Sequence, residues 1–154
     1  MIEIDIPARF WTVSYDGAQA PDADNDLARG ANCQRFAYAL LAEAGLRIPP
    51  FRSSELWEDE NYTWKPTMFE PLDLILFNRT ADPWGAHVAV IIGNGRAIHL
   101  CKAEGVPRIW SIEEFLACDR YRVLVGVKRV RSCGSEQPKN EVVAATLRRD
   151  GLRT

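Results

Sequence analysis

The chain has 154 residues, of which 47% are hydrophobic and 26% are charged, as is usual for a globular protein with one core. Its formal net charge is −2, and no basic recognition motif is present, so neither charge nor motif supports binding to nucleic acid. No apolar run is long enough to predict a membrane-spanning helix.

The N-terminal segment lacks the basic stretch and the apolar run of a secretory signal. The cytoplasm is therefore the default expectation for location. Residues 1–131 are expected to form a single domain, and residues 132–154 a linker with a peripheral tail. An acidic, turn-rich loop over residues 16–30 precedes the first strong element, and loops of this length in compact domains are often functional.

Residues 33–44 are expected to form one helix with a cysteine in its first turn. Asn32 is a strong N-cap residue, and Gly45 suits the position just past the helix end. Apolar residues recur at helical spacing and predict a core-facing stripe: Phe36, Ala37, Leu40, Leu41 and Ala44. Cys33 lies where backbone N–H groups and the helix dipole favour negative charge, which predicts a lowered thiol pKa. A free cysteine alone more commonly just packs in a core.

The second half of the chain has strand patterns. The expected strands cover residues 74–77, 86–92, 96–101 and 121–130. Ser111 and Glu114 form a capping-box pattern that predicts a short helix, and Ser53 or Ser54 is expected to cap another. One helix ahead of an antiparallel sheet predicts an α+β fold.

The chain contains four cysteines, at positions 33, 101, 118 and 133, with no paired spacing. They are expected to be free thiols and not a disulfide framework. His87 and His99 are too far apart for a helical zinc pair, and no Cys-x-x-Cys motif exists. We therefore expect no metal and no cofactor, although a Cys/Cys/His/His site assembled in three dimensions stays open.

Both histidines of the chain lie in one predicted hairpin, around Gly93-Asn94-Gly95. A thiol nucleophile needs a base to take its proton and a third group to orient that base. Cys33 as nucleophile, His87 as base and His99 as orienter would form a Cys-His-His triad in chain order.

The register of this hairpin decides whether the triad can form. A two-residue turn in regular pairing would place His99 opposite Val90, and the two histidines on opposite faces of the sheet. With residues 93–95 all in the loop, His99 lies opposite Ala89 and both histidines share a face. We therefore predict an odd-length loop. We also predict that the cysteine helix covers the histidine face, and that Val88, Val90 and Ile92 pack on the other face.

The same register places Cys101 opposite His87. Cys101 would then be a second thiol close to the active centre. It either fills space or forms an inhibitory disulfide with Cys33 on oxidation.

Three segments resemble the NlpC-like family of papain-like, cell-wall cysteine peptidases. Gly-Ala-Asn-Cys at residues 30–33 opens the helix, and residues 70–77 are similar to the family's Pro-Gly-Asp-Leu strand. Residues 87–99 match in both residue types and spacing, and the resemblance runs from about Tyr15 to about Val130. It implies a papain-like α+β fold, with the nucleophile-bearing helix packed on a central antiparallel sheet.

The resemblance also implies roles for individual residues. Cys33, His87 and His99 would form the triad, and Tyr15 would lie near the oxyanion site. The family's Asp-Cys-Ser-Gly motif becomes Asn-Cys-Gln-Arg here, so its substrate-binding positions fall on Asn32 and Gln34. A neutral amide thus replaces a carboxylate, which removes a charge-assisted bond to a substrate ammonium.

The implied activity is hydrolysis, through an acyl-enzyme, of amide bonds in peptidoglycan stem peptides, often between D-glutamate and the following diamino acid. A substrate of this kind would be met as recycled wall fragments, or after phage-like release or another route of export. Two alternatives stay open: a CHAP-type amidase, and a catalytically idle papain-like module that binds a peptide. The sequence leaves the oligomeric state open.

Overall fold

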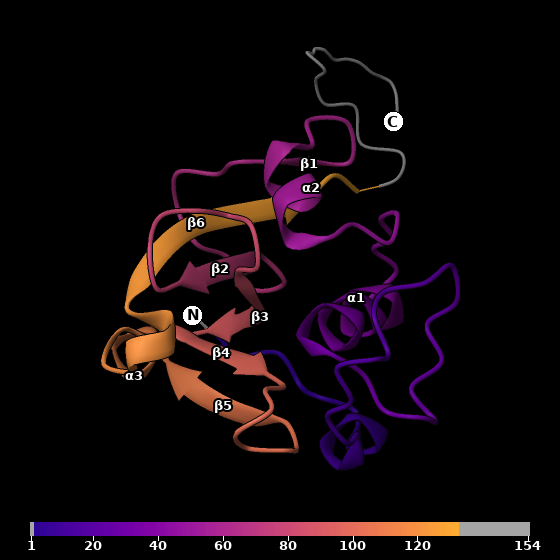
Figure 1. Ribbon diagram of the computed structural model, residues 1–154. Helices are drawn as coiled ribbons and strands as arrows, with labels where there is room; N and C mark the ends of the chain where they lie inside the picture. Colours follow the sequence, from indigo (N-terminus) through magenta and orange to yellow (C-terminus); the bar gives the residue numbers. More distant parts are fainter. Residues whose placement is uncertain (1, 133–154) are drawn as a thin grey trace.

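The structure is a computed structural model that describes residues 2–132. Its centre is a six-stranded antiparallel sheet with the strand order β1-β6-β2-β3-β4-β5 (Figure 1). The strands are β1 (Thr63–Trp64), β2 (Leu74–Asn78), β3 (His87–Gly93), β4 (Arg96–His99), β5 (Arg108–Ser111) and β6 (Val123–Val130). Apart from residue 132, the predicted C-terminal tail lies outside the described residues.

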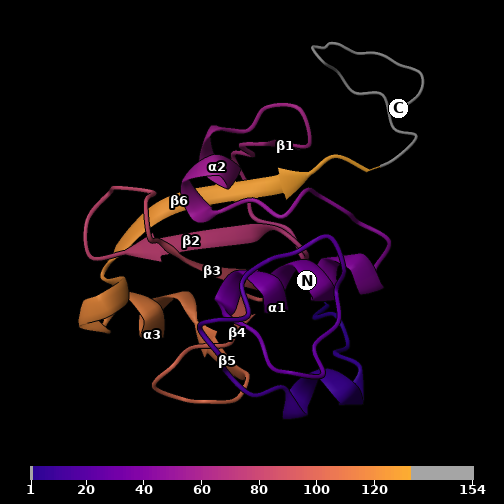
Figure 2. The same ribbon diagram turned by 45° about the vertical axis from the view of Figure 1, so that its right-hand side comes forward.

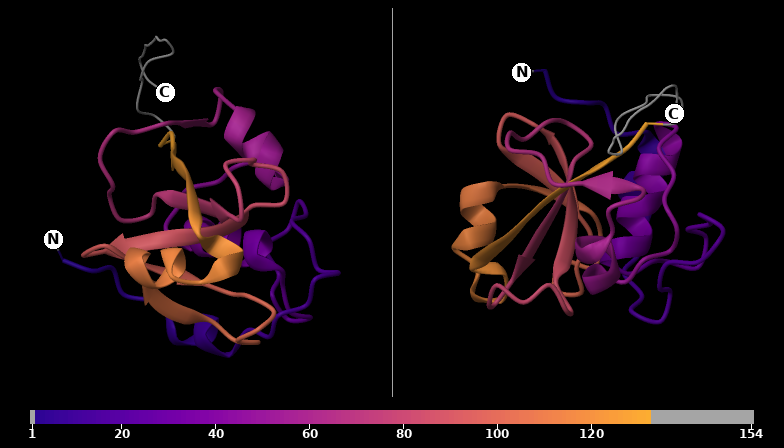
Figure 3. Two further views of the ribbon diagram at one scale, coloured as in Figure 1. Left: turned by 60° about the vertical axis from the view of Figure 1, so that its left-hand side comes forward. Right: turned by 90° about the horizontal axis from the view of Figure 1, so that it is seen from above.

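Helices lie on both sides of this sheet. They are α1 (Cys33–Glu43), α2 (Ser53–Glu58) and α3 (Ile112–Leu116), with 3-10 turns η1 (Ala8–Thr12) and η2 (Asp119–Tyr121). Seen from above, α1 and α3 lie on opposite faces of the sheet (Figure 3). The α+β fold, with the cysteine-bearing helix packed on a central antiparallel sheet, is therefore confirmed. In residues 2–132, no helix combines the length and apolar character needed to cross a membrane.

Two hydrophobic clusters hold these layers together. On one face of the sheet, the apolar stripe of α1, which includes Phe36 and Leu40, packs against Val88, Val90 and Ile98. The cluster on the opposite face contains alternate residues of the same strands, together with side chains from α3 and η2: Ile75, Phe77, Ala89, Ile91, Ala97, Cys101, Phe115, Tyr121 and Val127. Because side chains alternate along a strand, both faces of β3 are buried.

Helix α2 lies beside β6 (Figure 2), and the Lys128 ammonium donates a 3.1 Å hydrogen bond to the Trp57 carbonyl. The predicted serine cap of α2 is wrong, because Arg52 is the N-cap residue and its backbone N–H donates to the Glu55 carboxylate at 2.8 Å. Ser53 is buried, and its hydroxyl accepts a 3.2 Å hydrogen bond from the Ala86 N–H. Ser53 thus anchors the segment that leads into β3.

The β3–β4 hairpin reaches the register that the triad requires, but by a different route from the predicted one. Its turn has two residues, Asn94 and Gly95, both at positive φ (54° and 68°), while Gly93 pairs with Arg96. An irregularity in β3 between residues 91 and 93 then shifts the pairing by one residue, so that Val90 lies opposite Ile98. The predicted three-residue loop is therefore wrong, and a bulge supplies the odd residue.

Gly93 occupies this bulge at φ 126°, and a Cβ there would lie 3.2 Å from Glu3 Cα and 3.2 Å from the Ile2 carbonyl oxygen. We expect Gly93→Ala to lower the free energy of unfolding by about 2 kcal/mol or more, through backbone strain and crowding. Gly95→Ala is the matched control, because Gly95 also has positive φ but an added Cβ meets nothing within 4 Å. Its expected loss is about 1 kcal/mol. Urea unfolding measures both, and equal losses would contradict a tightly enclosed bulge.

Candidate active site

Cys33 begins α1, as predicted, and Asn32 caps the helix. The Asn32 side-chain oxygen accepts a 2.8 Å hydrogen bond from the Arg35 N–H. The half-buried Cys33 thiol lies beside the backbone N–H groups of Gln34 and Val88, which act to lower its pKa. Because Val88 directly follows His87, the thiol lies at the start of β3.

Burial is the larger influence on this thiol and raises its pKa to about 11, against the effect of the surrounding N–H groups. The expectation of a lowered thiol pKa at the helix N-terminus is therefore wrong for the free protein. The N–H groups of the first turn do favour the thiolate, but the cost of taking a charge out of water exceeds their effect.

The two histidines form a direct pair. His87 Nε2 and His99 Nδ1 lie 2.9 Å apart in a hydrogen bond, and the two rings are nearly perpendicular at 85°. Both residues are buried, with exposed fractions of 8% and 1%. The prediction that both project from one face of the sheet is confirmed.

The prediction of which face they occupy is wrong. Val88, Val90 and Ile92 are packed in the cluster under α1, whereas both histidine rings contact Phe115 of α3 on the opposite face. The apolar stripe of α1 packs against the aliphatic side chains of β3, so the histidines and their aromatic neighbours lie on the other face of the sheet. The Cys33 thiol, in the first turn of the helix, therefore meets β3 at its starting end and not across its face.

Aromatic rings enclose the histidine pair. Tyr121 stacks on the His87 ring, with ring centroids 4.4 Å apart and an interplanar angle of 19°. Trp110 and Phe115 contact the His99 ring, with centroids at 4.4 Å and 4.6 Å. His99 Nε2 is buried among the described residues without a hydrogen-bond partner.

This environment keeps both imidazoles neutral. Burial, followed by the charges of His99 and Arg120, holds the pKa of His87 well below 6.5. Burial and the Arg120 charge lower the pKa of His99 to about 3. The resting site thus contains a neutral thiol and two neutral imidazoles at pH 7.

Tyr15 is held next to the start of α1. It forms an isolated β-bridge with Ala31, and its N–H donates to the Gly105 carbonyl at 2.8 Å. Burial raises the pKa of the Tyr15 hydroxyl, and Cys33 and Cys101 raise it further through their charges. Tyr15 and the cysteine thiol therefore share one region, although 17 residues separate them in the sequence.

The structure also describes Gln34 and three of the four cysteines. Gln34 is buried, with 7% of its surface exposed. Cys101 is buried. Burial raises the pKa of the Tyr121 hydroxyl, and Cys101 raises it further through its charge and its hydrogen bond with that hydroxyl. Cys33, Cys101 and Cys118 are free thiols, whereas Cys133 lies outside the described residues. Within residues 2–132, no group of three or more His, Cys, Asp or Glu side chains is arranged to hold a metal ion.

Arg35, which was not among the residues predicted from the sequence, holds the acidic loop. Its buried guanidinium donates hydrogen bonds to the carbonyls of Asp26 (3.0 Å) and Ala20 (2.9 Å), and to the Asp24 carboxylate (2.8 Å). The first turn of the Cys33 helix thereby carries three links to the loop. Charge complementarity between a helix arginine and an acidic loop is the only signal in the sequence that pointed to these contacts.

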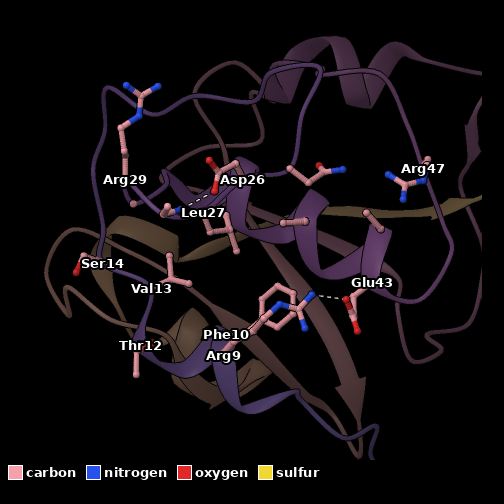
Figure 4. Close-up of a pocket in the computed structure, with 15 residues that line it drawn as sticks. Arg9, Phe10, Thr12, Val13, Ser14, Asp26, Leu27, Arg29, Glu43 and Arg47 are labelled. Carbon is pink, nitrogen blue, oxygen red and sulfur yellow. Dashed lines mark hydrogen bonds and ion pairs between the residues drawn. The ribbon is translucent and has the colours of Figure 1, made fainter.

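A cavity lies away from this chemistry. It has a volume of about 810 Å³ and lies between η1, loop residues 25–30 and the exposed side of α1. Arg9 and Glu43 form an ion pair on one of its walls, while Arg29 and Arg47 lie toward its ends (Figure 4). None of the predicted site residues lines it.

No protein-family model matches the sequence, and no curated protein matches it. Solved structures do match. An NlpC/P60 family protein from Bacillus cereus aligns with a TM-score of 0.51 at 25% identity, over 66% of this chain and 32% of that one. The peptidoglycan hydrolase RipB from Mycobacterium tuberculosis aligns with a TM-score of 0.52 at 20% identity, over 80% of this chain and 59% of that one. The chain has the fold of the NlpC/P60 proteins.

A third NlpC/P60 match is a lipoprotein-like protein from Staphylococcus aureus. Its TM-score is 0.51 at 18% identity, over 83% of this chain and 43% of that one. The aligned regions thus span only 32% to 59% of these three proteins. The resemblance of the sequence to NlpC-like peptidases is confirmed in the fold.

Both histidines affect how stability depends on pH. In the unfolded chain they bind protons below about pH 6.5, whereas in the folded protein they stay neutral. The free energy of unfolding should therefore fall as the pH drops below 6.5, by about 1.4 kcal/mol per pH unit for each histidine. Urea unfolding between about pH 7 and about pH 5 measures this slope. His99→Phe should make it shallower, and an unchanged slope would mean that His99 is not held neutral.

The thiol pKa predicts how Cys33 reacts with iodoacetamide. With a pKa of about 11, the thiolate fraction and the alkylation rate should rise about tenfold per pH unit between about pH 7 and about pH 10. Mass spectrometry of the Cys33 peptide separates this reaction from those of the other thiols. A rate that is already at a plateau near neutral pH would show a thiolate–imidazolium pair and contradict the neutral one.

Proposed function

We propose that the chain is a cysteine hydrolase that cleaves amide bonds in peptidoglycan-type stem peptides. Cys33 is the nucleophile, His87 the general base and His99 the residue that orients the base. The observation that carries the proposal is the 2.9 Å hydrogen bond between His87 and His99. The Cys33 thiol of α1 lies next to the start of β3, the strand that begins with His87. The shared fold with NlpC/P60 proteins, one of which is a named peptidoglycan hydrolase, supports it.

The chemistry follows from a neutral resting pair. As the Cys33 sulfur attacks the substrate carbonyl carbon, His87 Nδ1 takes the thiol proton, so no free thiolate has to form in the buried site. The backbone N–H of Cys33 and the Tyr15 hydroxyl are the candidates to stabilise the oxyanion. When the tetrahedral intermediate collapses, His87 gives the proton to the departing amine, and an acyl-enzyme remains. Water then attacks the acyl carbon, with His87 again as base, and the thiol is restored.

His99 selects the tautomer of His87 that this chemistry needs. His87 must carry its proton on Nε2, so that the Nδ1 lone pair is available to the thiol. That Nε2–H is donated to His99 Nδ1, and the proton of His99 is then on Nε2, next to the Trp110 and Phe115 rings. The opposite tautomer would direct a proton of His87 toward the sulfur and block the transfer.

The capping role of Asn32 bears on the choice of substrate. Its side-chain oxygen is engaged by the Arg35 N–H, so its NH₂ group is what remains for a ligand. An NH₂ group donates hydrogen bonds, which suits a substrate carbonyl or carboxylate and not an ammonium. Together with Gln34, Asn32 would therefore favour a stem peptide whose nearby end is uncharged or acidic.

The test is a digest of purified muropeptides followed by mass spectrometry. Cys33→Ala should lower hydrolysis at least about 10³-fold without loss of the fold, because no other group supplies the covalent step. His87→Ala should lose more activity than His99→Ala, because an orienting residue affects the rate only through the base. Cys118→Ala is the matched control, because it removes another free, partly exposed thiol and should keep full activity. Substantial turnover by Cys33→Ala would exclude the covalent mechanism.

A second candidate function is an idle module that binds a stem peptide without cleaving it. The raised thiol pKa and the lowered His87 pKa favour it, since both oppose proton transfer in the free protein. The same muropeptides distinguish the two functions. Binding measured by calorimetry, with no new mass in the digest and equal affinity for Cys33→Ala, would identify a module.

A further inference from the structure

Tyr121 contacts the proposed base but belongs to no part of the triad. Its ring stacks on the His87 imidazole at a centroid separation of 4.4 Å and an interplanar angle of 19°. Separations of this size are typical of stacked aromatic pairs, which contribute beyond their buried area. Among the described residues, Tyr121 has the shortest ring-centroid separation from His87, and it lies on the face of the sheet opposite α1.

The position of Tyr121 is itself well defined. It closes the 3-10 turn η2, where its N–H donates a 2.9 Å hydrogen bond to the Cys118 carbonyl. Asp119 in the same turn forms ion pairs with Arg79 at 2.8 Å and with Arg122 at 2.6 Å. The Tyr121 side chain is 7% exposed. These contacts hold the turn that carries Tyr121. Its ring covers one face of the His87 imidazole.

One hydrogen bond does not determine the orientation of an imidazole. The bond between His87 Nε2 and His99 Nδ1 fixes one point of the ring, while the terminal torsion of a histidine has broad energy minima. The ring can still rotate about that point, and this rotation swings Nδ1 away from the sulfur. A stacked neighbour fixes the plane of the ring and removes this freedom.

We propose that Tyr121 is a positioning residue that fixes the plane of the His87 imidazole and so directs Nδ1 at the Cys33 sulfur. This inference rests on the proposed function, because it assigns Tyr121 a role in the same reaction. The aromatic face performs the role, and the hydroxyl, which hydrogen-bonds with Cys101, is not needed for it. Phenylalanine should therefore replace tyrosine here, whereas leucine should not.

The test compares Tyr121→Phe with Tyr121→Leu in the full chain. Tyr121→Leu should lower kcat for muropeptide hydrolysis at least about 10-fold with KM within about 2-fold, because the base is misdirected while the substrate contacts remain. Tyr121→Phe should stay within about 3-fold of wild type, because the stack is kept. Equal activity of Tyr121→Leu and wild type, or equal loss in both variants, overturns the proposal.

Nuclear magnetic resonance of the imidazole rings gives a second readout that does not depend on activity. The chain has only two histidines, so their signals are readily assigned. In wild type and in Tyr121→Phe, the His87 ring protons should be shifted upfield by the stacked ring, with one tautomer protonated on Nε2. Unshifted ring protons in wild type overturn the proposal even if Tyr121→Leu does not fold. A wild type with shifted protons but no hydrolysis would contradict the proposed function and leave the stacking role confirmed.

Discussion

The register between β3 and β4 is the constraint on which the arrangement of the site depends. Side chains along a strand alternate between two faces, so a shift of one residue would separate His87 from His99. The bulge at Gly93 inserts that one residue beyond a tight two-residue turn. The N-terminal segment supports it, because the Ile4 N–H donates a 2.9 Å hydrogen bond to the Ile92 carbonyl. A backbone detail at one end of the hairpin thus aligns two imidazoles at the other end.

Burial shapes the chemistry more strongly than any single charge. The same desolvation that excludes water from the His87–His99 pair makes the charged forms of the thiol and of both imidazoles costly. In the proposed mechanism, the thiol proton would therefore move to His87 only as the sulfur attacks a substrate carbonyl. The free protein would then carry no permanently ionised thiol, which would limit side reactions.

Local signals in the sequence predicted α1 and four of the six strands, but not β1 or β5, and not which face of the sheet α1 covers. The Asn32 cap and the apolar stripe predicted α1, and alternation with a turn signal predicted the hairpin; the structure has both. Which face α1 covers depends on whether its stripe fits aliphatic or aromatic side chains better, and that is a property of packing between distant segments. Tyr121 and Arg35 were missed for a related reason, because their partners lie 34 residues and 9 to 15 residues away in the chain.

The guanidinium of Arg35 has a mechanical consequence. Two residues after Cys33, it binds two carbonyls and one carboxylate of the acidic loop and so ties the loop to the first turn of α1. A ligand that displaces the loop would therefore also displace the helix turn that carries the Cys33 thiol. These contacts also limit substitutions in the loop, since they require its backbone path at positions 20 and 26 and the Asp24 carboxylate, whereas its other exposed side chains make no hydrogen bond with Arg35. The acidic loop is thus fixed in place on the outer side of the first turn of α1.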